Sequence, residues 1–343
     1  MRILCFTDNH FCENYSIVKK QGTNYSLRLE NQLVSLNWLE ETAVANNCDA
    51  IFCLGDFFDK PDLNEKEITA VKDIKWSSIP HYFLVGNHES SVNDLQYSST
   101  KILEADNRII ISTPTILTLG GIDFCMLPYV VESDRQDLSN YFPAERTKPR
   151  FIISHNDLRG IQMGPVVSKT GFSVEEIEAN CDLFINGHLH NGQKITNKIL
   201  NLGNFTGKDF GEDANKYPHN VLLIDTETAE LKFIENPYAF NFYKLEINTT
   251  DQANIFETYL KNQAIVSIKC KDFLLETVKQ KIENSTKILE SRVVIARDEI
   301  ALSDAEIDIS DLTLDHLEKF VECCKEKIDN SDILDFELAE ICR

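Results

Sequence analysis

The feature that most constrains this chain is a series of short polar motifs, each placed directly after an apolar stretch. Asp56 is central, because it follows the apolar run of residues 50–54 and the turn residue Gly55. Such runs indicate buried strands, and open α/β sheets place ligand sites where strands end. In chain order the motifs are Asp8-x-His10, Gly55-Asp56-x-x-Asp59, Gly86-Asn87-His88-Glu89, His155 and Gly187-His188-x-His190. They hold five of the eight histidines, so we expect one shared site.

The residue types in these motifs favour a pair of metal ions. Two divalent ions about 3.5–4 Å apart hold a phosphate between them and share a bridging hydroxide as nucleophile. The pair needs one carboxylate with two usable oxygens, and Asp56 is the candidate for that bridge. No cysteine lies in the motifs, so the donors suit manganese, iron or zinc better than calcium or a structural zinc knot.

Each motif also has an ordinary structural interpretation when it is taken singly. Asp8-Asn9-His10 alone is typical of a turn capped by its Asp, and an isolated His155 is typical of a hydrogen-bonded core histidine. Asp8 and His10 are expected on one side of a strand, and His188 and His190 on one side of an extended segment. The complete set, in this order, outweighs the separate interpretations and predicts a two-metal site.

The periodicity of the rest of the chain predicts an α/β fold. Helical spacing covers residues 27–45, and further helices are expected over 63–75, with Asn64 as the cap, 93–105 and 173–179. Gly120-Gly121 indicates a hairpin between two short strands. A second, more antiparallel sheet is expected from strands at 109–112, 116–119, 122–127, 193–196, 199–202, 221–225 and 231–234.

The 343 residues suggest more than one domain. We predict a catalytic domain over 1–237, ending at Asn236-Pro237, and a small α+β cap domain over 238–300. Residues 301–343 are predicted to be an acidic helical segment, since they hold four Lys/Arg against thirteen Asp/Glu. Its apolar stripe, which includes Leu314 and Phe320, fits packing on its own domain as well as docking on a partner.

The cysteines and the hydropathy bear on the compartment. The ten cysteines form no CxxC pair and lie mostly in apolar runs, which is typical of buried thiols in a reducing compartment. No signal peptide is visible, and no stretch approaches the roughly 20 apolar residues of a membrane helix. We therefore expect a cytoplasmic protein without a membrane partner.

The order of the five motifs resembles that of the calcineurin-like metallophosphoesterase superfamily. The resemblance covers about residues 1–235 and implies a double β-sheet sandwich flanked by helices. It implies that Asp8, His10, Asp56 and His190 hold one ion, and that Asp56, Asn87, His155 and His188 hold the other. It also implies that His88 stabilises the transition state or protonates the leaving oxygen.

Within that superfamily the chain looks most similar to DNA-repair exonuclease subunits of the SbcD type, in their bacteriophage versions. The similarity lies in Gly-Asp-Phe-Phe-Asp at 55–59, the run from Ser154 to Gln162, and the appended α+β unit. Protein Ser/Thr phosphatases carry Arg-Gly after the second Asp of the second motif, whereas Lys60-Pro61 stands here. Cellular members often have a second active-site histidine where this chain has Asp59, which leaves a role for that residue open.

This resemblance implies a manganese-dependent DNA nuclease that acts in DNA recombination, repair or degradation in a bacterial or phage-infected cell. It implies an SMC-like coiled-coil ATPase as partner and allows a homodimer. The net charge of −21 is unusual for a DNA-binding protein, so we expect the ATPase to supply most of the basic surface. The alternatives are a small-molecule phosphodiesterase or nucleotide phosphatase, for which the same site suffices, and a non-catalytic scaffold of the same fold.

Overall fold

The computed structural model describes residues 1–16, 18, 22–90, 94–163 and 166–296 of the chain. Residues Met1–Ala296 form one compact unit. No helix among these described residues is long and apolar enough to cross a membrane. The helices predicted between residues 311 and 341 lie outside the described residues, and the predicted domain limits at 237 and 300 remain predictions.

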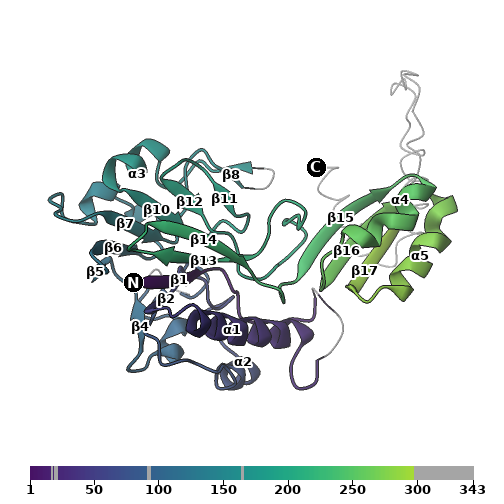
Figure 1. The fold of residues 1–343 in the computed structure, drawn as a ribbon, viewed down its shortest axis with the longest axis horizontal. Helices are drawn as coiled ribbons and strands as arrows, with labels where there is room; N and C mark the ends of the chain where they lie inside the picture. The colour runs from purple at the N-terminus through teal and green to yellow at the C-terminus, as the bar shows by residue number, and fades with distance from the viewer. Residues whose placement is uncertain (17, 19–21, 91–93, 164–165, 297–343) are drawn as a thin grey trace, which may run out of the picture. The chain divides into compact units, whose positions relative to one another are not determined.

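The first sheet has six strands and is built around β1 (Arg2–Phe6) (Figure 1). On one side of β1, three parallel strands follow in chain order, and on the other side lies an antiparallel pair, of which the strand next to β1 runs antiparallel to it. The parallel strands are β2 (Ala50–Cys53), β3 (His81–Leu84) and β4 (Arg108–Ile111), and the antiparallel ones are β13 (Asn220–Asp225) and β14 (Glu230–Glu235).

The second sheet also has six strands and is largely parallel. Its order is β11 (Gln193–Lys194), β12 (Ile199–Asn201), β10 (Leu183–Asn186), β7 (Arg150–Ser154), β6 (Ile122–Leu127) and β5 (Thr115–Leu119). The predicted membership of this sheet is wrong for β4, β13 and β14, which join the first sheet. The predicted antiparallel character holds only for the hairpin β5–β6 and for the short β11.

Three apolar layers hold the sandwich together, and they follow from period-2 alternation along the strands. In β1, Ile3 and Cys5 face the second sheet, whereas Leu4 and Phe6 face the helix side. The helix α1 (Leu27–Ala45), seen along the lower part of Figure 1, covers this outer face. The outer face of the second sheet packs with α3 (Val174–Asn180). The predicted double β-sheet sandwich flanked by helices is thus confirmed.

The observed helix bounds agree only in part with those predicted from the sequence. The bounds of α1 are those predicted, whereas α2 (Glu65–Val71) is shorter than the predicted 63–75. The helix predicted over 93–105 is wrong for the described residues, where only the 3₁₀ turn η1 (Ser99–Leu103) forms. Ser98 and Thr100 bond each other through their hydroxyls at 2.6 Å, and such local side-chain bonds compete with helix formation.

The cap of α2 carries a stability prediction. The Asn64 side chain accepts from the backbone N–H groups of Lys66 and Glu67, and Glu67 reciprocates at the Asn64 N–H. We expect Asn64→Ala to lower the free energy of unfolding by about 1 kcal/mol, because the first-turn donors lose their acceptor. Urea unfolding measures this change. The exposed Asn24→Ala serves as control, and an equal loss there would contradict the capping role.

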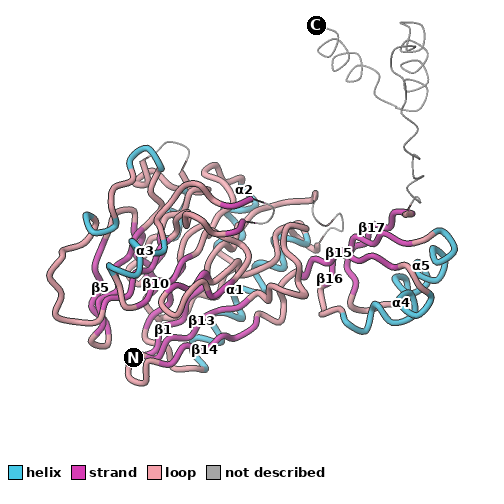
Figure 2. The backbone as a smooth tube through the Cα atoms, turned by 90° about the horizontal axis from the view of Figure 1, so that it is seen from above, coloured by secondary structure: helices cyan, strands magenta, loops and turns pink. Residues whose placement is uncertain are grey.

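The last elements form a third sheet of three parallel strands, β15 (Asn241–Ile247), β16 (Ala264–Cys270) and β17 (Ile288–Ile295). The helices α4 (Thr250–Ile255) and α5 (Leu275–Asn284) connect them and lie on one side of the strands in Figures 1 and 2. This strand–helix order is the predicted one. The remaining short elements are β8 (Gln162–Met163), β9 (Val166–Val167), η2 (Glu132–Asp134), η3 (Leu138–Asn140), η4 (Phe256–Tyr259) and η5 (Asp272–Leu274).

Candidate metal centre

Strand register brings the five motifs together. In the first sheet Phe6 pairs with Cys53, and Cys53 pairs with Phe83, so the loops after β1, β2 and β3 leave one edge. In the second sheet Ser154 pairs with Asn186, so His155 and the segment Gly187–His190 also start side by side. The N–H of His188 donates to Asp8 Oδ2 at 2.9 Å, which joins the two edges.

Two glycines show how closely these loops approach. A Cβ at Gly86 would lie 2.1 Å from Asp56 Oδ1 and 2.5 Å from the Asp56 nitrogen. A Cβ at Gly55, where φ is +110°, would lie 2.3 Å from His155 Nδ1. Cβ atoms essentially never come within 3.0 Å of another heavy atom, and a φ of +110° also disfavours a side chain at Gly55, so both positions favour glycine where the loops meet.

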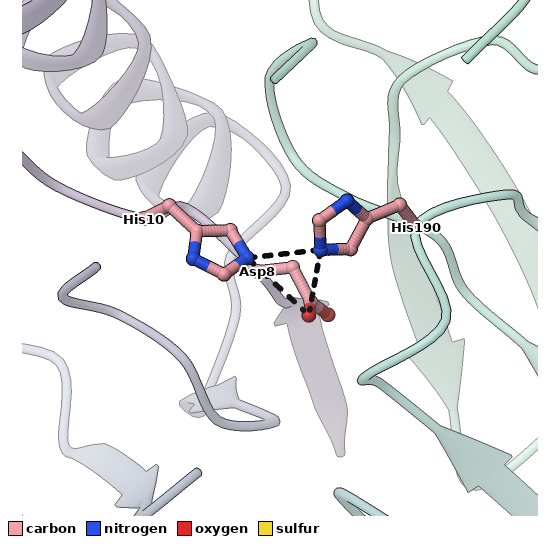
Figure 3. Close-up of side chains that lie close together, drawn as sticks. All are labelled: Asp8, His10 and His190. Atoms are coloured by element: carbon pink, nitrogen blue, oxygen red, sulfur yellow. Dashed lines mark hydrogen bonds and ion pairs between the residues drawn. The ribbon is translucent and has the colours of Figure 1, made fainter. Parts of the chain in front are cut away.

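Asp8, His10 and His190 form the first cluster (Figure 3). His10 Nε2 lies 3.8 Å from Asp8 Oδ1, and His190 Nε2 lies 3.9 Å from the same oxygen. The two Nε2 atoms are 3.0 Å apart. Three donor atoms that face one another from two sheets form a cradle suited to a small cation.

Asp56, His155 and His188 form the second cluster, with donor atoms within 4.8 Å of one another. Asp56 Oδ2 lies 3.2 Å from His155 Nε2 and 3.9 Å from His10 Nε2. The Asp56 carboxylate therefore lies between a histidine of the first cluster and a histidine of the second. This is the placement that a bridging carboxylate requires.

Orphaned polar atoms test whether the site fits metal ions. Among the described residues, the buried side-chain atoms without a hydrogen-bond partner include Asp8 Oδ1 and Asn87 Oδ1, and the buried His155 Nε2 has only the Asp56 carboxylate beside it, at 3.2 Å. A buried polar group without a partner costs about 1–3 kcal/mol, so native structures rarely tolerate several in one place. All three atoms belong to predicted ligands, and the donor set therefore fits a pair of divalent ions.

The outer nitrogens of the histidines are held by other groups, and this fixes which nitrogen faces the site. His155 Nδ1 lies 2.7 Å from Leu54 O, and His190 Nδ1 lies 3.0 Å from Glu212 Oε1. Because a carbonyl or carboxylate there accepts the Nδ1 proton, Nε2 keeps its lone pair, as in metal-ligating histidines generally. His10 follows the same pattern, with Nδ1 at 3.0 Å from Asp59 Oδ1.

His188 is held in the opposite sense. Its Nε2 lies 3.1 Å from Asp157 Oδ1, so Nδ1 is the nitrogen left for a ligand. The ring lies 5.1 Å from that of His155 and 6.1 Å from Tyr129, measured between centroids. Asp157 follows the fourth motif closely in sequence, yet no pattern in the sequence assigned it a role.

His88 lies beside the first cluster and forms a third group with His10 and Asp56, whose donor atoms lie within 4.8 Å of one another. Its backbone N–H donates to Asp56 Oδ1 at 3.0 Å, and its Nδ1 lies 2.9 Å from the carbonyl oxygen of Asp59. Its ring is 4.7 Å from that of His10. The side chain is 35% exposed, compared with 1% for His10 and 0% for His155. His88 is thus the most exposed imidazole of the five, ahead of His190 at 26% and His188 at 16%.

Burial and nearby charge shift two carboxyl pKa values in opposite directions. Burial raises the pKa of Asp56, but the imidazoles of His155 and His10 outweigh burial and hold it below its usual range. Burial raises the pKa of Glu89 to about 8, and the charge of Asp56 adds to that effect. Glu89 accepts from the N–H groups of Gly86 and Phe58, at 2.7 and 3.1 Å, and so ties the second motif to the third.

The backbone differs from the extended geometry that the sequence suggested. Asp8, His10, Asp56 and His188 all have positive φ, at 50°, 47°, 49° and 69°. The expectation that Asp8/His10 and His188/His190 lie on extended segments is therefore wrong. Asp and His enter the left-handed region more readily than most residues, and here it turns their side chains into the site after the strands have ended.

Most of the predicted site residues lie in the two clusters. Six of them do so, His88 lies beside the clusters, and Asn87 Oδ1 is a buried atom next to His88 in the same loop. Their roles as ligands remain predictions. Sequence reasoning gave no role to Glu212 or Asp157, which contact the histidines from outside and belong to no recognisable motif. It considered Lys208 only for a phosphate path, whereas Lys208 Nζ lies 3.2 Å from His10 Nδ1.

One family model and several solved structures match this chain. The family described as calcineurin-like phosphoesterase matches residues 1–192. The chain is similar to an archaeal phosphodiesterase, with 14% identity, coverage of 68% of this chain and 99% of that one, and a TM-score of 0.35. It is also similar to a dimetal phosphatase from Danio rerio, with 13% identity, coverages of 65% and 91%, and a TM-score of 0.39.

A third solved structure, the phosphoesterase Yfce from E. coli, shares 11% identity, with coverages of 69% and 100% and a TM-score of 0.34. Curated protein sequences gave no match. The family match covers more than half of the chain. The chain belongs to the calcineurin-like phosphoesterase family.

Proposed function

We propose that this protein is a two-metal nuclease that hydrolyses phosphodiester bonds in DNA. The observation that carries the hydrolytic part is the Asp56 carboxylate, placed between His10 and His155 at 3.9 and 3.2 Å. In this proposal Asp8, His10, Asp56 and His190 hold one ion, and Asp56, Asn87, His155 and His188 hold the other. When bound, such a pair supplies Lewis-acid activation of water and of the phosphate oxygens.

The remaining chemistry belongs to side chains of this protein. The Nδ1–H of His88 donates to the Asp59 carbonyl, so Nε2 is the nitrogen that faces the leaving oxygen. In its imidazolium form His88 gives the Nε2 proton to that oxygen and keeps the Nδ1 proton. Its exposure lets it reach substrate while Asp56 holds its backbone. Burial of His10 and His155 excludes water from the ligands and keeps the donor atoms in place.

The choice of DNA rests on sequence resemblance and on the order of the C-terminal elements. The chain resembles SbcD-type subunits in their phage versions, and strands β15–β17 with α4 and α5 supply an appended unit of the expected order. The same resemblance supports manganese as the ion and an SMC-like ATPase as the partner. The net charge of −21 supports the view that the partner supplies most of the phosphate-neutralising surface.

The test is manganese-dependent digestion of an end-labelled DNA duplex by the full chain, with and without an SMC-like ATPase. Cyclic nucleotides serve as competing substrates, and chelator-treated protein is the blank. We expect duplex cleavage that needs Mn²⁺ and increases with the partner. Turnover of cyclic nucleotides without any DNA cleavage would contradict the nuclease function and indicate a small-molecule phosphodiesterase. Absence of metal binding and of hydrolysis would favour a scaffold.

A further inference from the structure

One loop supports both histidines of the first cluster from outside. Glu212 Oε1 lies 3.0 Å from His190 Nδ1. Lys208 Nζ lies 3.2 Å from His10 Nδ1 and 3.0 Å from Asp59 Oδ1, the carboxylate that also lies 3.0 Å from that ring. Residues 208 and 212 thus act on the two imidazoles whose Nε2 atoms face each other at 3.0 Å.

The loop is built to hold these two side chains still. Glu212 is 3% exposed, and its second oxygen accepts from the Lys208 N–H at 2.8 Å. The Glu212 N–H donates to the Asp209 carbonyl at 3.2 Å. Both oxygens of a buried carboxylate are therefore used, one by the loop itself and one by a histidine, which fixes the distance between loop and ring.

Contacts with the segment that enters β15 anchor the ends of the loop. The fully buried guanidinium of Arg28 donates to the Gly207 carbonyl and lies over the ring of Phe240, 5.8 Å from its centroid. The Ala214 N–H donates to the Phe242 carbonyl at 3.0 Å, and the rings of Phe210 and Phe242 are 5.1 Å apart. The loop is thus attached at both ends to residues outside the metal centre.

We propose that Glu212 and Lys208 are positioning residues that set the cation affinity of the Asp8–His10–His190 cluster, an inference that rests on the proposed two-metal function. A carboxylate at Nδ1 fixes the tautomer and the rotation of the ring and makes Nε2 a better donor. Glu212 does this for His190. Lys208 holds the Asp59 carboxylate against His10 and balances its charge. The second cluster has separate supports, Leu54 O at His155 and Asp157 at His188.

This separation allows a test that distinguishes positioning from general structure. Mn²⁺ is titrated by calorimetry and by electron paramagnetic resonance into chelator-treated full chain. Glu212→Gln keeps the shape but offers one acceptor where two are needed. We expect about 10- to 100-fold weaker binding of one ion, with the other unchanged within about twofold. Asp157→Asn should weaken the other ion instead, and the double variant should weaken both.

Asp209→Asn is the matched control. It removes the same charge from the same loop, at an exposed position whose side chain accepts from the Gly211 N–H at 2.6 Å, a bond that Asn retains. Its Mn²⁺ affinities should equal those of the wild type. Melting of each metal-free variant, followed by circular dichroism, shows whether the fold persists.

The outcomes separate this inference from the proposed function. A folded Glu212→Gln that binds both ions as the wild type does, or that loses both equally, overturns the positioning role. If that variant does not fold, Lys208→Met decides, with several-fold weaker binding of one ion expected and unchanged binding contradicting the inference. If the wild-type protein binds two ions, and the variants weaken them separately as expected, but DNA stays intact, the proposed nuclease function is wrong. The positioning role of Glu212 and Lys208 is then retained.

Discussion

Asp56→Asn should reduce hydrolysis by about 10³-fold or more, since the loss of a bridge that organises two ions removes several kcal/mol of transition-state stabilisation. The substitution is nearly isosteric at a side chain that is 2% exposed, so the fold should persist. The amide retains an oxygen for the His88 N–H, now at 3.0 Å. Metal analysis of the purified variant should show fewer than two ions per chain.

Asp62→Asn is the control for this prediction. Asp62 lies in the same loop but is exposed, so its substitution removes an equal charge near the site without touching a ligand. Its turnover should match that of the wild type. Full metal content together with normal turnover in Asp56→Asn would remove the bridging role and, with it, the two-metal mechanism.

His88→Ala is expected to separate metal binding from catalysis. The loss of a positioned proton donor typically costs about 10²- to 10⁴-fold in rate, and turnover of DNA, the proposed substrate, should fall by that amount. Metal content should stay at the wild-type value, because the backbone N–H that contacts Asp56 remains. Parallel rate measurements and metal analysis on one preparation give both quantities.

The leaving group supplies the sharper comparison for His88. A p-nitrophenyl phosphodiester needs little help from a general acid, because p-nitrophenolate leaves without being protonated. The deoxyribose oxygen of DNA needs a proton in order to leave. The rate deficit of His88→Ala should therefore shrink strongly on the p-nitrophenyl substrate. An equal deficit on both substrates would assign His88 to charge stabilisation, and a loss of metal would make it a ligand.

Strand ends and helix spacing were accessible to sequence reasoning because they are local patterns. Residues 27–45 repeat apolar side chains at helical spacing, and α1 has those bounds. The five motifs each follow an apolar run, and the register of β1, β2, β3, β7 and β10 brings them to one place. The prediction of a shared site therefore depended on one physical rule, that parallel strands deliver their carboxyl ends to a common edge.

The sequence could not predict which strands pair, or which side chains contact the histidines from outside the metal centre. The central residues of β13 are apolar and buried on both faces, so its sequence fits either sheet. Only its hydrogen-bonded pairing with β1 places it in the first sheet. Glu212 lies 22 residues from His190 in a loop without a motif, and its contact depends on tertiary packing. The positive φ values of Asp8 and Asp56 likewise depend on neighbouring loops, which no sequence period records.

Those left-handed residues bear on how such a protein tolerates change. Each non-glycine residue held at positive φ stores about 1–3 kcal/mol of strain, which persists only when surrounding contacts over-determine it. Asp8, His10, Asp56 and His188 are four such residues in one centre. The scaffold therefore gives up stability to keep its donors preorganised for incoming ions. Stabilising substitutions selected without regard to activity should accumulate at these same four positions, and each gain there would erode the enzyme.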